Sequence, residues 1–337
     1  MYYILINNIQ MALITNTSEN VKAAAVPLDM QQQLQSNNNN YILRSELPVC
    51  KPFVKWAGGK TQLLPKLDLF IPCQFNRYFE PFLGGGALFF HLTTERKNRL
   101  LGTFCSSYCI SDINPELINA YLVIRDDVGE LISRLEQHQI RYNEGPEEYY
   151  YHLRKMDPNK LSNTARAARF IALNRTCFNG LYRVNRQGLF NVPWGKYSNP
   201  LICDSNNLRN VSIALRHYYS NITIKVSNYK EMLLENAKEG DFIYLDPPYS
   251  PESSTAYFTN YTCFGFGNKD QQDLADVFRK LDDRGCKVLL TNSDTPLIRN
   301  LYSGSAIVIE VDAKRAINCK GSKRAGHKDL IIRNYSK

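Results

Sequence analysis

The sequence predicts an α/β fold with an open sheet, and three observations support this prediction. Apolar runs with the length of strands alternate with helical segments on either side of residues 126–217. An early strand runs into a glycine-rich turn, and a late strand ends in Asp246-Pro247-Pro248-Tyr249. Within residues 126–217 the alternation breaks, which indicates a segment of different structure inserted into the α/β fold.

Length and composition limit the kinds of protein that the sequence can encode. With 337 residues, 44% of them hydrophobic, the chain can form one large domain or two ordinary ones. Lysine and arginine outnumber aspartate and glutamate by 41 to 32, and this net charge of +9 suits a polyanionic partner or simply a basic soluble protein. The 9 cysteines form no CxxC pair, which favours reduced thiols in a cytosol over disulfides or a zinc site. No apolar run is long enough to predict a membrane span.

The first 45 residues differ in composition from the rest of the chain. Gln31–Asn40 is a polar tract with little to bury, and the segment before it lacks the basic start of a signal peptide. We therefore predict that residues 1–45 form a disordered extension, with Met11 or Met30 as an alternative start of the protein.

The segment Lys51–Lys60 opens the part of the chain that we expect to be ordered. Its Gly58-Gly59 pair permits a tight turn against a ligand, and Trp56 offers a flat face for stacking. A phosphate-binding P-loop is excluded because Val54 occupies the position where that motif needs its first glycine. The alternative is a capped helix start with the tryptophan in the core.

The next element is a strand from Arg77 that leads through Gly84–Gly86 into a helix. Such a turn lets a nucleotide-like ligand approach the backbone at a helix N-terminus. A second strand ends at Asp112, whose carboxylate is placed to accept from both hydroxyls of a ribose. The alternative role for this aspartate is an ordinary N-cap of the helix that Asn114–Glu116 begins.

Arginine and aromatic residues interleave in the insert, and one part of it has the pattern of a β-hairpin. Leu181–Val184 and Leu189–Val192 flank a turn over Asn185–Gly188. A two-stranded ribbon that carries arginine and asparagine can enter the major groove of DNA, where arginine reads guanine and asparagine reads adenine. The alternative is a plain surface hairpin.

Regular alternation resumes after the insert. The predicted strands are Ile222–Val226, Asp241–Leu245, Lys287–Thr291, Ala306–Val311 and Leu330–Arg333, and the predicted helices are Tyr229–Ala237, Asp270–Arg284 and Thr295–Leu301. The basic loop Lys314–Arg324 suits contact with phosphates or, equally, a solvated charged surface.

The segment Asp246-Pro247-Pro248-Tyr249 is the most informative part of the sequence. It follows an apolar strand, and ligands bind at the carboxyl ends of strands in open α/β sheets. The two prolines remove backbone donors and fix φ, which leaves the carbonyls of Asp246 and Pro247 free near an aromatic ring. Rigid acceptors beside such a ring suit a flat ligand with an exocyclic amino group, such as adenine or cytosine. The alternative is an ordinary turn.

Taken together, these segments resemble the Dam-type, α-class family of S-adenosylmethionine-dependent DNA adenine-N6 methyltransferases. The resemblance covers Leu47–Tyr335. Its motifs, in the α-class order, are Lys55–Lys60, Glu80–Gly86, Ser111–Asn114, the Asn174–Tyr197 block, Asp246–Tyr249 and Thr291–Asp294. Two departures from the family pattern are small: Phe178 stands where a tyrosine is familiar, and Gly85 where an alanine is frequent.

The resemblance implies a seven-stranded, Rossmann-like methyltransferase sheet with an inserted, mainly helical target-recognition domain that carries the β-hairpin. The catalytic domain would span residues 46–125 and 218–337, and the recognition domain residues 126–217. The resemblance also implies a site-specific enzyme that transfers the methyl group of S-adenosylmethionine to N6 of a flipped adenine in double-stranded DNA, within GATC and without a metal. We expect a monomer in a prokaryotic cytosol, with or without a cognate restriction enzyme.

The resemblance further assigns roles to individual residues. The cofactor would be held by Trp56, Lys60, Glu80, Phe82, Gly84, Gly86, Asp112 and Asp246. The predicted catalytic residues, which would hold the flipped adenine, are Asp246, Pro247, Pro248 and Tyr249. The DNA target would meet Lys55, Phe178, Asn179, Leu181, Arg183, Asn185, Pro193 and Lys196.

Three alternatives stay open at the level of the sequence. An adenine-N6 or cytosine-N4 methyltransferase that acts on another nucleic acid would share the Asp-Pro-Pro-Tyr motif, although the Asn174–Tyr197 block favours duplex DNA. A catalytically inert DNA-binding regulator would not need intact cofactor and catalytic motifs. A nicotinamide dehydrogenase would need GxGxxG, and Ala87–His91 does not supply the third glycine.

Overall fold

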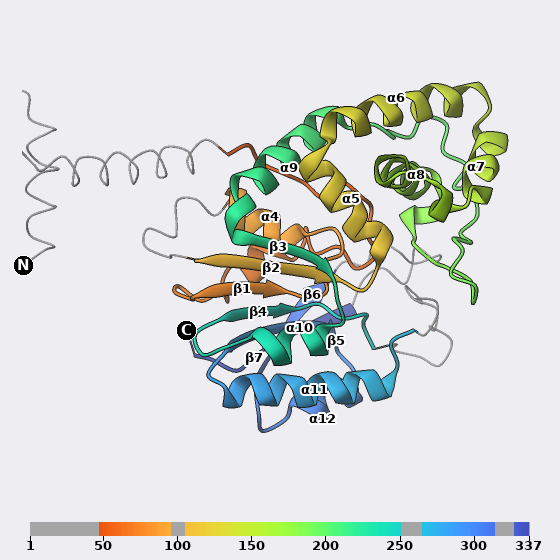
Figure 1. Cartoon of the computed structure of the whole chain (residues 1–337). Helices are drawn as coiled ribbons and strands as arrows, with labels where there is room; N and C mark the ends of the chain where they lie inside the picture. The colour runs from red at the N-terminus through yellow and green to blue at the C-terminus, as the bar shows by residue number, and fades with distance from the viewer. Residues whose placement is uncertain (1–46, 96–104, 251–264, 314–326, 337) are drawn as a thin grey trace, which may run out of the picture. The chain divides into compact units, whose positions relative to one another are not determined.

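The computed structural model of the chain describes residues 47–95, 105–250, 265–313 and 327–336 (Figure 1). Seven strands form one sheet in the order β3-β2-β1-β4-β5-β7-β6. Their bounds are β1 Arg77–Glu80, β2 Ser107–Asp112, β3 Ile222–Val226, β4 Phe242–Leu245, β5 Lys287–Ser293, β6 Ile307–Ala313 and β7 His327–Arg333. The predicted seven-stranded α/β fold is thereby confirmed. The predicted extension 1–45 and the basic loop Lys314–Arg324 lie outside the described residues.

The sheet is parallel except for one strand. β1 pairs in parallel with β2 and with β4, and β3 and β5 continue the same direction outward. β7 runs antiparallel to both β5 and β6. The chain builds one half of the sheet with β1 to β3 and returns to the middle with β4, so the strand order reverses between β1 and β4. Ligands of open α/β sheets bind at such a reversal point, at the carboxyl ends of the strands.

Helices cover both faces of the sheet. α10 Tyr229–Asn236, α11 Asn268–Asp283 and α12 Pro296–Tyr302 cover one face, and α4 Ala87–Phe90, α5 Pro115–Asp126 and α9 Ser205–His217 cover the other. Alternate residues of β4 serve the two cores: Phe242 and Tyr244 pack on the α5 side, and Ile243 and Leu245 pack on the α11 side. Burial of both faces explains why this strand is a continuous apolar run in the sequence.

The insert is mainly helical, as the sequence predicts. It contains α6 Val128–Glu144, α7 Pro146–Lys155, α8 Asn163–Thr176 and the 3₁₀ turns η3 Pro158–Lys160 and η4 Phe178–Gly180, and its last residues form α9, which packs on the sheet. The remaining short helices are α3 Leu64–Leu67, the π-helical η1 His91–Glu95 and the 3₁₀ turn η5 Tyr219–Asn221. α5 packs against both α8 and α9, so the insert is continuous with the helices on the sheet, and the division into two domains stays a prediction. None of the described helices is long and apolar enough to cross a membrane.

Two local interpretations of the sequence need comment. The alternative role of Asp112 as a helix N-cap is wrong, because Asn114 caps α5 by accepting from the backbone N–H groups of Glu116 and Leu117. The predicted hairpin is present but is paired over a shorter length than expected, with a single bridge between Val184 and Phe190 in place of two strands.

Candidate active site

The turn between β1 and α4 lies at the reversal point of the sheet and is shaped by glycine. Gly84 and Gly86 have φ of 50° and 69°, in the left-handed region that favours glycine. A Cβ on Gly86 would lie 2.6 Å from the hydroxyl oxygen of Tyr121 on α5, so close packing also excludes a side chain there. In the same turn, the ring of Phe82 packs on Tyr229 of α10, with centroids 5.2 Å apart. The turn is therefore anchored to helices on both faces of the sheet.

Asp112 ends β2 beside this turn and binds it through backbone hydrogen bonds. The N–H of Gly84 donates to Oδ2 at 3.0 Å, and the N–H of Asn114 donates to Oδ1 at 2.9 Å. Burial raises the pKa of this carboxyl to about 6, and the backbone bonds oppose that rise. Each oxygen has a second lone pair, so Asp112 can still accept from the hydroxyls of a ligand.

Glu80 ends β1 and is only 2% exposed. The hydroxyl of Tyr78 donates to its Oε2 at 2.8 Å. Burial raises the pKa of the Glu80 carboxyl to about 8, and the nearby carboxylates of Asp246 and Asp112 act in the same direction. Glu80 is therefore mostly protonated at neutral pH, and in that form it can donate as well as accept a hydrogen bond.

Trp56 is half-buried and lies against the glycine turn. A Cβ on Gly84 would be 2.7 Å from Cδ1 of Trp56, so the indole rests on the backbone of that glycine. The indole stacks on Tyr182 of the insert, with centroids 5.9 Å apart and an angle of 23° between the rings, and its centroid is 6.3 Å from that of Phe170. The position of Trp56 fits both the predicted stacking role and the alternative role as a core residue.

Asp246 follows β4 directly, on the other side of the reversal point. Lys60 Nζ lies 2.7 Å from its Oδ1, and the hydroxyl of Thr291 donates to the same oxygen at 2.8 Å. The ammonium of Lys60 is itself buried and also donates to the carbonyl of Gly58 at 2.6 Å. Burial raises the pKa of Asp246, and Lys60 and Thr291 oppose that rise by stabilising the carboxylate. Both contacts are to Oδ1, which leaves Oδ2 as the oxygen that can accept from a ligand.

The backbone after Asp246 is held by β5 and α11. Gln271 of α11 donates to the carbonyl of Pro248 at 2.9 Å. Asn292 of β5 accepts from the N–H of Ser250 at 3.1 Å. These two side chains are themselves joined by a hydrogen bond of 3.0 Å, so the backbone of Pro248 and Ser250 is held by buried polar groups on two elements.

Tyr249 completes the group around Asp246. Its ring centroid lies 4.5 Å from Lys60 Nζ, and its hydroxyl donates to Oδ2 of Asp329 at 3.5 Å, a long contact. The structure thus brings the predicted catalytic residues Asp246 and Tyr249 together with the predicted cofactor residue Lys60. A carboxylate, a cation and an aromatic ring meet at the carboxyl end of β4.

Except for Lys55, the predicted DNA-facing residues lie on the segment Phe178–Lys196, which we call the recognition hairpin. Phe178, the first residue of this segment, is 45% exposed, and Asn179 next to it has a φ of 56°. The guanidinium of Arg183 donates through Nε to Oδ1 of Asn191 at 2.7 Å. This bond uses one edge of the arginine and fixes its plane, while other N–H groups remain for a partner.

Three of the other predicted DNA-facing residues have local roles in the recognition hairpin. Oδ1 of Asn185 accepts from the backbone N–H groups of Gln187 and Leu189, both at 3.0 Å, so this side chain stabilises the turn. The carbonyl of Pro193 accepts from the N–H of Phe178 at 2.9 Å and closes the base of the hairpin. The carbonyl of Leu181 accepts from the thiol of Cys177 at 3.2 Å.

Asn174 joins the recognition hairpin to the Lys55 segment. Its Oδ1 accepts from the N–H of Lys55 at 2.8 Å, and its Nδ2 donates to the carbonyls of Lys55 and Gly180 at 2.8 and 3.0 Å. Gly180 has a φ of 63°, and a Cβ on it would lie 2.4 Å from Cβ of Lys55. This junction therefore depends on a buried asparagine and on a glycine that no other residue can replace without strain.

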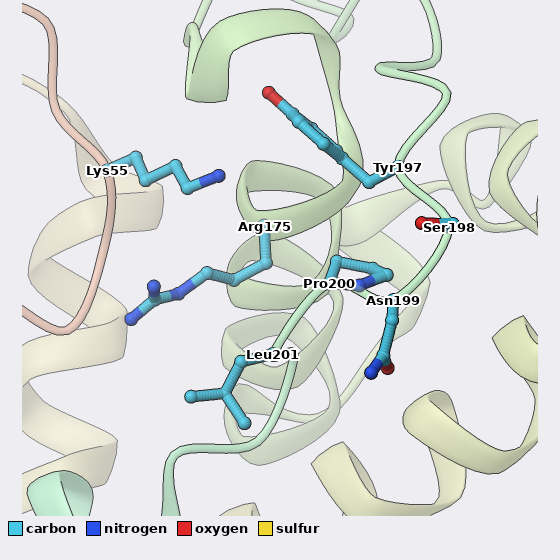
Figure 2. A pocket seen from close by; sticks show the side chains of 7 residues that line it. All are labelled: Lys55, Arg175, Tyr197, Ser198, Asn199, Pro200 and Leu201. Atoms are coloured by element: carbon cyan, nitrogen blue, oxygen red, sulfur yellow. The ribbon is translucent and has the colours of Figure 1, made fainter.

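A pocket of about 350 Å³ opens beside this junction (Figure 2). Its lining consists of Lys55, Arg175 and the segment Tyr197–Leu201. Lys55 Nζ lies 4.5 Å from the centroid of the Tyr197 ring. Burial lowers the pKa of Lys55, and the charge of Arg175 lowers it further. Arg175 donates to the carbonyl of Phe53 at 2.8 Å, whereas its buried Nε has no hydrogen-bond partner among the described residues. Two cations in one pocket suit an anion.

Comparison with known proteins decides the family. A family model described as "D12 class N6 adenine-specific DNA methyltransferase" matches residues 56–317. The chain belongs to this family. It is therefore an adenine-specific DNA methyltransferase, and the resemblance to Dam-type enzymes seen in the sequence is confirmed.

Individual relatives agree with this assignment. The chain is 42% identical over 290 residues to the Type II methyltransferase M1.LlaDCHI of Lactococcus lactis subsp. cremoris, covering 85% of this chain and 95% of that protein. It is also 42% identical over 299 residues to the Type II methyltransferase M.MjaIII of Methanocaldococcus jannaschii, covering 85% and 99%. A DNA adenine methylase of Vibrio cholerae is 34% identical over 282 residues, covering 83% and 95%.

The sequence does not assign roles to two residues of this enzyme that the structure places at the candidate sites. Thr291 contacts Asp246, and its signal in the sequence is a polar residue at the end of an apolar strand. Arg175 lines the pocket, and its signal is its place beside Asn174 in the recognition block. Among the described residues, no group of three or more His, Cys, Asp and Glu side chains is placed to hold a metal ion.

Proposed function

We propose that this enzyme transfers the methyl group of S-adenosylmethionine to N6 of an adenine flipped out of duplex DNA, within GATC. The observation that carries the proposal is the Asp246 carboxylate at the carboxyl end of β4. Its Oδ1 is held by Lys60 and Thr291, and its Oδ2 is available to a ligand. An exocyclic amino group needs such an acceptor, and the ring of Tyr249 lies in the same group.

The groups at the end of β1 fit a charged nucleoside. The glycine turn brings backbone close to the reversal point of the sheet, and the carboxyl groups of Glu80 and Asp112 can bind hydroxyl or amino groups. The indole of Trp56 can cover the adenine ring of the methyl donor. When bound, S-adenosylmethionine supplies a methyl group on a positively charged sulfur that is a good leaving group.

Asp246 and Pro247 act on the target adenine. Oδ2 of Asp246 and the carbonyl of Pro247 accept from the two N6–H groups, which directs the nitrogen lone pair toward the methyl carbon. The bound donor would supply the methyl carbon with its sulfur as the leaving group, which keeps the electron pair of the C–S bond, and the proton lost from N6 would pass to the Asp246 carboxylate and then to water. The carboxylate stabilises the positive charge that develops on N6 in a site with little water.

The DNA must present its adenine outside the base stack, which costs a few kcal/mol. Tyr249 stacks on the flipped base and offsets part of that cost, since base–aromatic stacking contributes about 1–3 kcal/mol. Phe178 is exposed on the recognition hairpin, where it can contact the bases that remain stacked. Arg183 lies on the same hairpin in an orientation fixed by Asn191 and can read a guanine of GATC.

Lys55 and Arg175 support the choice of DNA over a small substrate. Their pocket opens beside the recognition hairpin and combines two cations with the ring of Tyr197. A phosphate of the DNA backbone has the charge and size to enter it. The GATC target itself rests on the resemblance of the Asn174–Tyr197 block to the Dam-type pattern.

We also propose that the enzyme works as a monomer in a prokaryotic cytosol. The seven described cysteines are all free thiols, as expected for a reducing compartment. Light scattering of the purified enzyme, with and without a GATC duplex, tests the monomer: we expect one chain per duplex, and a stable dimer in solution would contradict it.

The test of the proposed function is methylation of plasmid DNA in a host that lacks adenine methylation. We expect plasmid from cells that express the enzyme to resist a nuclease blocked by methylated GATC and to be cut by a nuclease that requires it. Nucleoside mass spectrometry of the same DNA should show N6-methyladenine. N4-methylcytosine, or N6-methyladenine outside GATC, would contradict the proposed base or the proposed sequence, respectively.

A further inference from the structure

We propose that Thr291, itself held by Tyr244, is a positioning residue that fixes the orientation of the Asp246 carboxylate for the methyl transfer. This inference rests on the proposed function of Asp246. Thr291 touches neither reacting group, and its effect on the reaction is exerted entirely through Asp246.

The parallel pairing of β4 and β5 creates the contact. Leu245 pairs with Leu290, so Asp246 and Thr291 are the next residues on two neighbouring strands. The hydroxyl of Thr291 donates to Oδ1 of Asp246 at 2.8 Å. Thr291 is fully buried, and its hydroxyl exchanges no hydrogen bond with bulk water.

Tyr244 also contacts Thr291. Its hydroxyl lies 3.2 Å from Oγ1 of Thr291, and both groups are buried. The Thr291 hydroxyl has one proton, which it donates to the Asp246 carboxylate. In its contact with Tyr244, Oγ1 of Thr291 must therefore be the acceptor and the Tyr244 hydroxyl the donor. The three groups then form a chain from Tyr244 through Thr291 to Asp246, in which each bond polarises the next.

The chain matters because a carboxylate alone has a poorly defined orientation. The last torsion of an aspartate has a broad, two-fold profile, so one contact does not fix the plane of the two oxygens. Thr291 and Lys60 approach the same oxygen from different elements, β5 and the loop after Trp56. Because Thr291 and Lys60 both bind Oδ1, the plane of the carboxylate is fixed. Oδ2 is thereby kept in one place, where it can accept from the N6–H of the adenine.

The same bond affects the charge of Asp246. Burial raises the pKa of this carboxyl, and the hydrogen bond from Thr291 opposes that rise. Among the described residues, the ionisable groups that act on Asp246 or respond to it include Lys60, Asp329, Glu80 and Tyr244. Of these, Lys60 favours the carboxylate and Asp329 disfavours it. Loss of the Thr291 hydroxyl removes a group that favours the ionised form, so the pKa of Asp246 should rise.

The test compares Thr291→Val with Thr291→Ser. Valine keeps the β-branched shape and removes the hydroxyl, whereas serine keeps the hydroxyl and removes one methyl group. We expect valine to lower the single-turnover rate of methyl transfer about 10- to 150-fold, the usual effect of losing a hydrogen bond to a charged group. The Kd for a GATC duplex should stay near that of the wild type. Serine should keep most of the rate.

The pH profile separates a positioning role from a merely structural one. In Thr291→Val, the acidic limb of the rate profile should move to higher pH, because Asp246 is then protonated more easily. In Thr291→Ser the limb should stay in place. The inference would be overturned if Thr291→Val kept the wild-type rate of methyl transfer and the wild-type acidic limb. It would also be overturned if the rate fell only in proportion to a lower melting temperature.

Tyr244→Phe provides a second variant that does not alter β5. It should lower the rate less than Thr291→Val and move the acidic limb in the same direction, since it weakens the chain without breaking the bond to Asp246. An unchanged limb in this variant would show that Tyr244 has no part in the chain. An inactive wild-type enzyme would instead overturn the proposed function, and this inference with it.

Discussion

The catalytic edge and the recognition hairpin of this enzyme differ in how they hold their functional side chains. At the catalytic edge, formed by the ends of β1, β2 and β4, Asp246 is held by Lys60 and Thr291, which are distant in sequence and buried. On the recognition hairpin, Arg183 bonds to Asn191 within the same hairpin, and Phe178 is 45% exposed. Chemistry needs groups that are in place before the substrate arrives, whereas sequence reading needs side chains that can reach a partner outside the protein.

Asn174 and Gly180 join the recognition hairpin to the Lys55 segment, and breaking this junction should have a large effect on stability. Gly180→Ala places a Cβ 2.4 Å from Cβ of Lys55 on a residue with a φ of 63°. We expect the free energy of unfolding to fall by about 2–4 kcal/mol from strain and overpacking together, measured by denaturant unfolding.

Gly188→Ala is the matched control for this junction. Gly188 has a φ of 76°, but a Cβ on it would meet no described heavy atom within 4 Å, so only the backbone strain remains. We expect a loss of about 1–2 kcal/mol. Equal losses in the two variants would show that the contact between Gly180 and Lys55 does not hold the hairpin.

At the catalytic edge, Tyr249→Ala should weaken the hold on the flipped base. Loss of about 1–3 kcal/mol of stacking corresponds to a drop of roughly 5- to 150-fold in kcat/KM, measured by methyl transfer to a GATC duplex. Tyr249→Phe keeps the ring and loses only the long contact to Asp329, so it should stay near the wild-type value. A phenylalanine variant as weak as the alanine variant would contradict a stacking role.

On the recognition hairpin, Arg183→Ala should change selectivity and leave the chemistry intact. A bidentate contact with guanine discriminates by about 1–3 kcal/mol, so the preference for GATC over one single-base variant should shrink. Methylation rates on GATC and on its single-base variants measure this preference. An equal loss on every duplex would identify Arg183 as a positioning residue, with no part in reading the sequence.

At the catalytic edge, the pH dependence of stability should depend on Glu80. Burial raises the pKa of Glu80 from 4.5 to about 8, so between these values the folded protein binds more protons than the unfolded chain. Stability from this group is therefore present below pH 4.5 and declines as the pH rises toward 8. Glu80→Gln should flatten that decline in denaturant unfolding at several pH values. The same decline in the variant would show that another group causes it.

The sequence predicts the catalytic edge better than the hairpin, for a physical reason. Strands buried on both faces are apolar runs, and glycine and proline at their ends mark turns with few conformations. These signals predict β4, the glycine turn and the place of Asp246 at the end of its strand correctly. Contacts across the sheet, such as Thr291 with Asp246, depend on the register of two strands and leave no pattern in the sequence.

For the hairpin, the sequence predicts the turn in the right place but too much pairing between the arms. The N–H of Gly188 donates to the carbonyl of Asn185 at 2.9 Å, which confirms the turn. The arms are joined by two backbone hydrogen bonds, Asn185 N–H to Leu189 and Asn191 N–H to Arg183, and by the side-chain bond of Arg183 with Asn191, over too short a length for a regular ladder. The alternation of residue types in the sequence is the same for a hairpin with a regular backbone ladder and for one with only a few bonds between its arms, so it cannot predict which of the two forms.

The most direct test of the account is a single-turnover experiment with Asp246→Ala, in which flipping and methyl transfer are measured on the same complex. A GATC duplex with 2-aminopurine at the target position reports flipping by fluorescence, and an adenine duplex with a labelled methyl donor reports transfer. We expect near-normal flipping and DNA affinity, with transfer slowed by at least about 10³-fold. Transfer at the wild-type rate would contradict the assignment of Asp246 as the group that binds and activates N6.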